Sequence, residues 1–123
     1  MTVTYDAWRY QIRLAQGATF ARAFTVKLDG TNATDLTSYT ARMQVRRQIS
    51  TVAYLAEWTS AGSAGARLVL GGVAGTVTFD LNAATTAALP PGLWFYDVEI
   101  VSGTGVVTRI LGGRFEVDPE VTR

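Results

Sequence analysis

The residues best suited to chemistry in this sequence are carboxylates that recur two positions apart. Asp97 and Glu99 form one such pair, and Glu116 and Asp118 form another. Two carboxylates can perform acid–base work on a glycosidic bond when burial raises the pKa of one of them. Here each carboxylate alternates with large apolar residues, a pattern equally typical of the solvent-facing side of a strand. We therefore expect no catalytic site, and Asp80 has the same alternation.

Other reactive groups are missing from the composition. The chain contains no cysteine and no histidine, which excludes disulfides, thiolate nucleophiles, histidine bases and Cys/His zinc sites. Asp29, Asn32 and Asp35 are calcium-ligand types, but their spacing matches no calcium loop and favours a turn. Gly71, Gly72 and Gly75 are not followed by the Gly-Lys-Ser/Thr of a phosphate loop. We expect neither a metal nor a cofactor.

Five side chains are candidates for contacts with other proteins. The arginines Arg42, Arg46 and Arg47 could grip an acidic partner, or could form an ordinary solvated face. Tyr5 and Trp8 lie in a possible N-terminal arm of residues 1–8, where aromatic side chains could dock on a neighbouring subunit. Alternatively, Trp8 joins the core by alternating with Tyr10. A short tail, residues 119–123, could pair with the sheet edge of a partner.

Length and charge limit the remaining possibilities. A chain of 123 residues with 48% hydrophobic residues and 17% charged residues fits one folded domain, residues 1–123. A formal net charge of +1 supplies no excess of cations for a phosphate backbone, so we expect no nucleic-acid partner. The sequence shows no signal peptide and no apolar run long enough to span a membrane, so we expect no membrane partner.

Alternation with a period of two dominates the sequence and predicts strands throughout. The predicted strands are 8–14, 20–28, 39–46, 53–59, 68–70, 76–81, 93–101, 106–111 and 114–118, with a bend or bulge at Gly112 and Gly113. Asn82 can cap one short helical turn near residues 83–88. About eight strands with regular turns predict an all-β, antiparallel, immunoglobulin-like sandwich. In such folds a tyrosine anchors the corner before a central strand, and Tyr96 is the candidate.

The second half of the chain resembles a family of small β-sandwich proteins of tailed-phage virions. The segments that carry the resemblance are 77–82, 85–89, 91–98, 110–117 and 121–123, with 17–24, 35–37, Arg42 and Arg46 added by the first half. Members of this family form the start of baseplate upper proteins and the connectors that join long tail fibres to the tail. The single motifs are loose, and their order and spacing carry the likeness.

The resemblance implies a non-enzymatic structural protein of a bacteriophage virion. It would sit in the tail tip, baseplate or fibre-attachment apparatus, docking other virion proteins in several copies after assembly in the bacterial cytoplasm. A capsid decoration or head–tail junction protein would use the same fold on another surface. A carbohydrate-binding module is a further alternative, suggested by Tyr54, Trp58 and Trp94. A hydrolase would require a buried carboxylate pair.

Overall fold

The computed structural model describes residues 2–3, 7–8 and 10–122, with side chains from residue 10 onward. These residues are almost entirely strands and turns, and eight of the strands have four or more residues, so the all-β prediction is confirmed. The strands are β1 (Thr2–Val3), β2 (Ala7–Trp8), β3 (Ile12–Ala15), β4 (Ala23–Val26), β5 (Thr40–Arg46), β6 (Ala56–Thr59), β7 (Ala66–Leu70), β8 (Thr76–Leu81), β9 (Gly92–Val101) and β10 (Val107–Asp118). The helical segments are η1 (Gly72–Ala74) and α1 (Ala83–Ala87).

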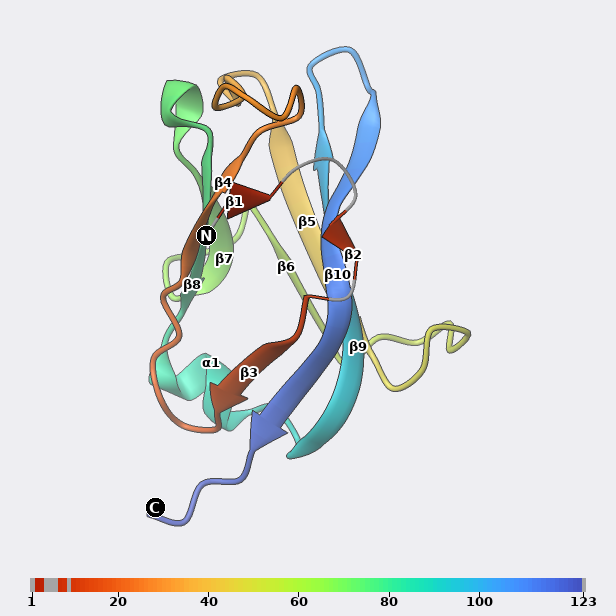
Figure 1. Ribbon diagram of the computed structural model, residues 1–123. Coiled ribbons are helices and arrows are strands. Elements are labelled where there is room, and N and C mark those ends of the chain that lie inside the picture. Colours follow the sequence, from red (N-terminus) through yellow and green to blue (C-terminus); the bar gives the residue numbers. More distant parts are fainter. Residues whose placement is uncertain (1, 4–6, 9, 123) are drawn as a thin grey trace.

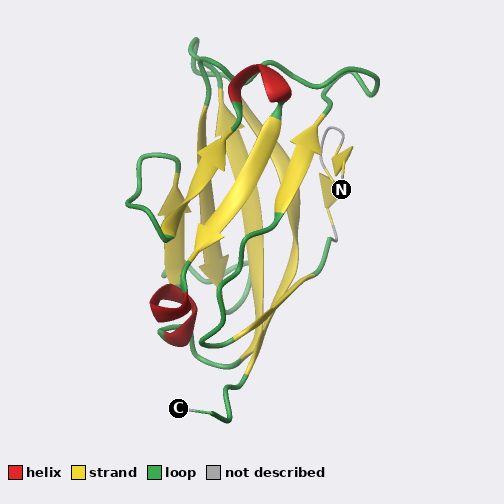
Figure 2. Cartoon of the chain, turned by 90° about the vertical axis from the view of Figure 1, so that its left-hand side faces the viewer, coloured by secondary structure: helices red, strands yellow, loops and turns green. Residues whose placement is uncertain are grey.

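The strands form two sheets packed face to face (Figure 1). One sheet has four strands in the order β1-β4-β8-β7, and the other has six, in the order β2-β10-β9-β5-β6 with β3 also paired to β10. An immunoglobulin-like sandwich has this connectivity, with the first, second, fifth and fourth strands in one sheet and the third, sixth and seventh in the other. Figure 2 views the sandwich from the four-stranded side, with the two helical segments at opposite ends.

The N-terminal strands depart from the predicted antiparallel pairing. β1 pairs with β4, and β2 and β3 pair with β10, all in parallel. The chain therefore starts in one sheet and crosses to the other before it reaches β4. Every other strand pair is antiparallel among the described residues. Neither helical segment of this part of the chain is long and apolar enough to cross a membrane.

The space between the sheets is filled by the inward side of the alternating strands. In β8, Val77, Phe79 and Leu81 are buried, and Phe79 lies with its ring centroid 5.5 Å from that of Phe20. In β10, Phe115 is fully buried. Its ring lies 6.2 Å from that of Trp58 and 5.9 Å from that of Tyr96. Aromatic pairs at these distances add packing energy to the apolar area that they bury.

The corner between β8 and β9 is held by α1, as predicted. Asn82 Oδ1 accepts a hydrogen bond from the backbone N–H of Thr85 at 2.9 Å, so it caps this turn. The residue that anchors the corner is Trp94, not Tyr96. The indole Nε1 of Trp94 donates to the carbonyl of Pro90 at 3.0 Å, whereas the Tyr96 hydroxyl donates to the carbonyl of Tyr10 at 2.7 Å. The prediction for Tyr96 was wrong because this hydroxyl binds the backbone of Tyr10, in the segment that connects β2 to β3.

The irregularity in the last strand lies two residues before the predicted site. The pairing of β10 with β9 shifts register between Arg109 and Leu111. Gly112 and Gly113 remain in regular register opposite Asp97 and Tyr96. β10 therefore runs as one strand through both glycines, and its extra residue is Ile110.

Candidate protein interface

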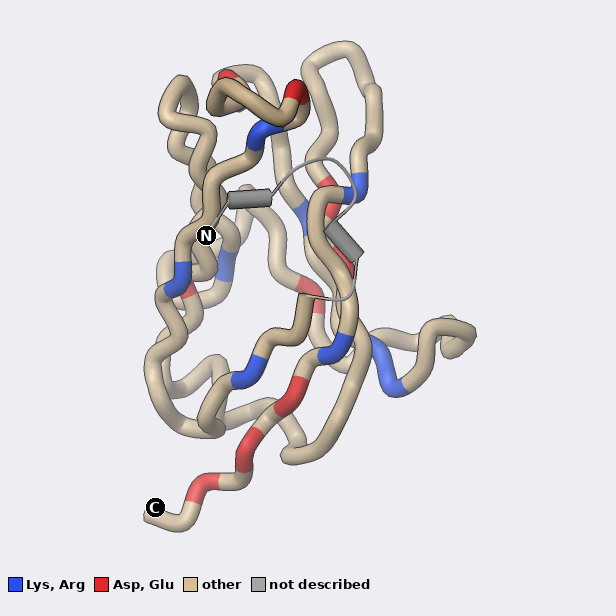
Figure 3. The backbone as a smooth tube through the Cα atoms, in the orientation of Figure 1, with Lys and Arg blue, Asp and Glu red and all other residues tan. Residues whose placement is uncertain are grey.

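Most of the charged strand residues with described side chains lie in the strands of the six-stranded sheet, as the backbone coloured by residue type shows (Figure 3). On β5, Arg42, Gln44 and Arg46 alternate with the buried Met43 and Val45 and therefore point outward. In the four-stranded sheet, the charged strand residues with described side chains are Arg67 and Asp80, which form an ion pair at 2.9 Å. The two sheets thus differ in the number of charged residues that their described strands carry.

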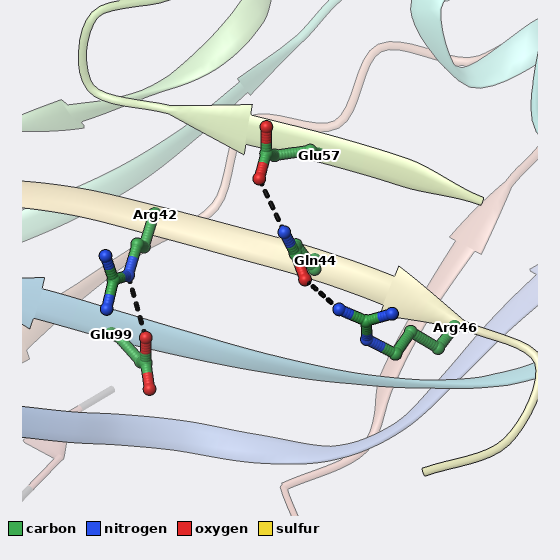
Figure 4. Close-up of polar contacts among 5 residues, drawn as sticks. All are labelled: Arg42, Gln44, Arg46, Glu57 and Glu99. Atoms are coloured by element: carbon green, nitrogen blue, oxygen red, sulfur yellow. Dashed lines mark hydrogen bonds and ion pairs between the residues drawn. The ribbon is translucent and has the colours of Figure 1, made fainter. Parts of the chain in front are cut away.

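Strand register places the outer side chains of β5 beside partners on β6 and β9. Arg42 lies opposite Glu99, and Gln44 lies between Glu57 and Asp97. The Nε of Arg42 forms an ion pair with Glu99 at 2.8 Å, and Gln44 Nε2 donates to Glu57 at 2.6 Å (Figure 4). Exposed ion pairs of this kind contribute roughly 0–1 kcal/mol each. These contacts pair Arg42 with Glu99 and give the Glu57 carboxylate a hydrogen-bond donor within the same sheet.

The three arginines predicted as a cationic cluster have separate partners. Arg42 pairs with Glu99. Arg46 donates to Gln44 Oε1 and to the backbone carbonyls of Thr51 and Val52. The guanidinium of Arg47 lies 5.0 Å from the ring centroid of Trp94, a cation–π distance.

Arg46 and Arg47 both hold the connection between β5 and β6. We call residues 47–55 the apolar loop, because it exposes Ile49 (67%), Val52 (91%) and Tyr54 (52%). Figure 1 shows this loop projecting sideways from the sandwich. The predicted strand 53–59 starts only at Ala56, so Tyr54 belongs to the loop. Ile49 and Val52 were not predicted as surface residues of interest because they follow no period, and only their apolar character in a loop could have pointed to them.

A second surface feature lies beside β7, at the edge of the four-stranded sheet. It is an open hollow of about 430 Å³, which we call the β7 hollow. Its lining residues are Tyr39, Thr40, Ser60, Ala61, Arg67, Leu68, Val69 and Leu70. Among the described strands, β8 is the one that pairs with β7, so the other edge of β7 faces the hollow unpaired.

Asp97, on the six-stranded sheet, lies in an environment that disfavours the ionised form of its carboxylate. It is half-buried, and within the described part of the chain its carboxylate has neither a hydrogen bond nor an ion pair. Burial and the nearby charge of Glu99 raise the pKa of Asp97, while Arg109, Arg46 and Arg42 oppose the shift. The residue opposite Asp97 on β10 is Gly112, so β10 provides no side chain beside it at this position.

The raised pKa predicts that Asp97→Asn stabilises the protein at neutral pH. A carboxyl whose pKa is higher in the folded state than in the unfolded state stays protonated to a higher pH in the folded state. The free energy of unfolding therefore falls as the pH rises from the ordinary pKa of aspartate to the raised one. Asparagine cannot ionise and avoids this loss. We expect a gain below about 1 kcal/mol, because solvent screens a half-exposed group. Urea unfolding at pH 7 and at roughly pH 3 measures it, and the gain vanishes at the lower pH.

Asp80→Asn is the matched control with the opposite sign. The backbone N–H of Gly65 and the guanidinium of Arg67 both donate to Asp80, at 3.1 and 2.9 Å, and lower its pKa. A lowered pKa contributes stability that is present at neutral pH and lost as pH falls. Asp80→Asn is therefore expected to destabilise at pH 7. Equal effects of the two substitutions would contradict the assignment of Asp97.

The remaining sequence predictions fall partly outside the described structure. Tyr5 lies outside the described residues, and so does the side chain of Trp8, whose backbone in β2 pairs with Gly112. In the C-terminal tail, the N–H of Glu120 donates to the side chain of Gln16 at 3.0 Å. Within residues 10–122, the tail therefore begins against its own chain.

The aromatic residues that suggested a carbohydrate module do not form an exposed row. Trp58 is buried against Phe115, and Trp94 is engaged by Pro90 and Arg47. Tyr54 alone of the three is exposed. Glu116 and Asp118 both pair with Arg13, at 3.2 and 2.9 Å. Among the described residues, no three acidic side chains lie close enough to hold a metal ion.

Comparison with family models and curated proteins identifies no family for this chain. The sequence matches no protein-family model and no curated protein. The resemblance to tailed-phage virion proteins therefore remains a prediction from the sequence.

Proposed function

We propose that this chain is a non-enzymatic structural protein of a bacteriophage virion. It acts in the tail tip, baseplate or fibre-attachment apparatus by docking other virion proteins in multiple copies. The observation that carries the proposal is the apolar loop, which exposes Ile49, Val52 and Tyr54 and is held in place by Arg46 and Arg47. Groups of exposed apolar side chains mark surfaces that other molecules cover.

The rest of the surface supports docking through a limited area. Several charged groups of the six-stranded sheet have partners on the same sheet, as in the ion pair of Arg42 with Glu99 and the hydrogen bond that Gln44 donates to the Glu57 carboxylate. A rigid β-sandwich keeps its loops in place, so a partner that binds one loses little conformational freedom of the protein. The sequence resemblance supplies the kind of assembly, a tailed-phage particle.

Labelling of particles tests this proposal. Antibodies against the purified chain are applied to phage particles from the strain that encodes it, and the gold label is located by electron microscopy. Label at the tail tip or fibre attachment supports the proposal. Label on the head would place the protein as a capsid decoration or head–tail junction component, and particles without label would remove the virion role. Antibody depleted on the purified chain is the control.

A further inference from the structure

The side chain of Arg46 holds the apolar loop to the six-stranded sheet. Its guanidinium donates to the carbonyl of Thr51 at 3.0 Å and to the carbonyl of Val52. It also donates to Oε1 of Gln44, two positions earlier on the same face of β5 (Figure 4). All three acceptors are uncharged oxygens, so these contacts give the positive charge of Arg46 no negative partner.

The carboxylate of Asp97 lies within reach of Arg46 on the neighbouring strand. Strand register places Gln44 directly opposite Asp97, and Arg46 stands two positions further along β5, diagonal to Asp97. Diagonal positions on one face are about 7–8 Å apart, a separation that a long side chain spans. Asp97 and Arg46 line the same cavity of about 90 Å³, as does Ile49 of the loop. The guanidinium can therefore turn from the loop to the carboxylate by a change of rotamer.

Arg46 also differs from the other cations near Asp97. The charged groups that face Asp97 from the described strands are Glu99 on β9, Arg42 and Arg46 on β5, Glu57 on β6, and Arg109 and Arg114 on β10. Arg42 is already paired with a carboxylate, that of Glu99 at 2.8 Å. An ionised Asp97 offers Arg46 a stronger acceptor than those it now has, because charge-assisted hydrogen bonds are roughly twice as strong as neutral ones.

We propose that ionisation of Asp97 transfers the Arg46 guanidinium from the loop carbonyls to the Asp97 carboxylate. The loop is held while Asp97 is protonated and is released once Asp97 has lost its proton to solvent. Arg47 remains on the ring of Trp94, so the base of the loop stays attached. Burial and the charge of Glu99 raise the pKa of Asp97, which places the transfer above the ordinary pKa of aspartate.

The transfer makes the arrangement of the apolar loop depend on pH, and its importance for docking rests on the function proposed above. The held loop presents Val52 and Tyr54 in one arrangement, so a partner that binds it has less conformational entropy to remove. Such a partner binds more tightly when Asp97 is protonated. By linkage, its binding also raises the pKa of Asp97 and takes up a proton.

Hydrogen exchange of the purified chain, measured residue by residue at about pH 4 and about pH 7, tests the transfer. The amide of Thr51 reports on the loop, because it donates to the carbonyl of Gln48 at 3.0 Å. We expect its protection factor, corrected for the intrinsic effect of pH, to be about two- to fivefold lower at the higher pH, the range of an exposed pair of charges. Asp97→Asn is expected to keep the higher protection at both pH values.

Two further variants complete the test. Glu116→Gln is the matched control, because it removes a carboxylate of the same sheet whose partner is Arg13 at 3.2 Å. It is expected to respond to pH like the unaltered chain. Arg46→Gln is expected to give low protection at both pH values. If Arg46→Gln fails to fold, as judged by circular dichroism, the NMR signal of the Arg46 Nε–H in the unaltered chain replaces it, and this signal must shift with the midpoint of the Asp97 carboxyl.

Three results would overturn the proposed transfer. These are equal protection of Thr51 at both pH values in the unaltered chain, an equal response in Asp97→Asn, and a response that survives in Arg46→Gln. An Arg46 signal that does not follow the Asp97 carboxyl counts equally against it. The test uses the chain alone, so its failure leaves the virion role standing, whereas particles without label remove that role and leave the response of the loop to pH intact.

Discussion

Replacing Phe115 with alanine is expected to lower the free energy of unfolding by about 3–5 kcal/mol. Phe115 is fully buried and joins three strands, because its ring contacts Trp58 of β6 and Tyr96 of β9. Alanine removes the ring and leaves a cavity between the sheets that its neighbours fill only in part. Small domains have a total stability of about 5–15 kcal/mol, so this loss is a large fraction of it. Urea unfolding followed by circular dichroism measures the change.

Val107→Ala on the same strand is the control for Phe115→Ala. Val107 is exposed, so its truncation is expected to cost well under about 1 kcal/mol. If Phe115→Ala does not fold, Phe115→Leu supplies a smaller loss in the same direction. Equal stabilities of the Phe115 and Val107 variants would show that β10 does not pack as described.

Gly75→Ala is expected to destabilise the protein by about 2–4 kcal/mol, from backbone strain and a steric clash together. Gly75 has φ of +71°, a left-handed conformation that side chains disfavour. A Cβ at this position would lie 2.7 Å from the carbonyl oxygen of Thr34 and 3.0 Å from Cβ of Ala33. Backbone must move to admit it, and this would disturb the bond from the N–H of Val26 to the Gly75 carbonyl, now 2.8 Å.

Gly30→Ala separates the two causes. Gly30 has φ of +79°, but a Cβ built there meets no atom within 4 Å. It carries the left-handed penalty alone, about 1–2 kcal/mol. The difference between the Gly75 and Gly30 variants in thermal or urea unfolding therefore reports the clash. A Gly75→Ala variant as stable as Gly30→Ala would mean that the loop at Thr34 does not lie against η1.

The arginines show how a correct choice of residues can carry a different meaning. Arg46 and Arg47 were singled out as groups that could bind an acidic partner. In the structure their guanidinium groups bind carbonyls of the apolar loop and the ring of Trp94. Their contribution to docking is therefore to position Val52 and Tyr54. Arg42 has no such role, since it pairs with Glu99 across neighbouring strands.

Much of the fold follows from local patterns. Burial of alternate residues makes strands such as 76–81 recognisable, because a period of two turns one face inward. The turn 83–87 was predictable from Asn82, because its side chain caps a backbone N–H only three positions away. The inward set Val77, Phe79 and Leu81 was identifiable for the same reason. Each of these features depends on residues within a few positions of one another.

What depends on partners far along the chain was decided only by the tertiary structure. The Tyr96 hydroxyl reaches Tyr10, 86 positions away, and the register shift at Ile110 is set by pairing with β9. The same holds for the parallel pairing of β3 with β10 and for the support of the apolar loop by Trp94. Sequence periodicity tells which face of a strand is buried. It does not specify which strand lies alongside, and that choice determines every side chain met across the sheet.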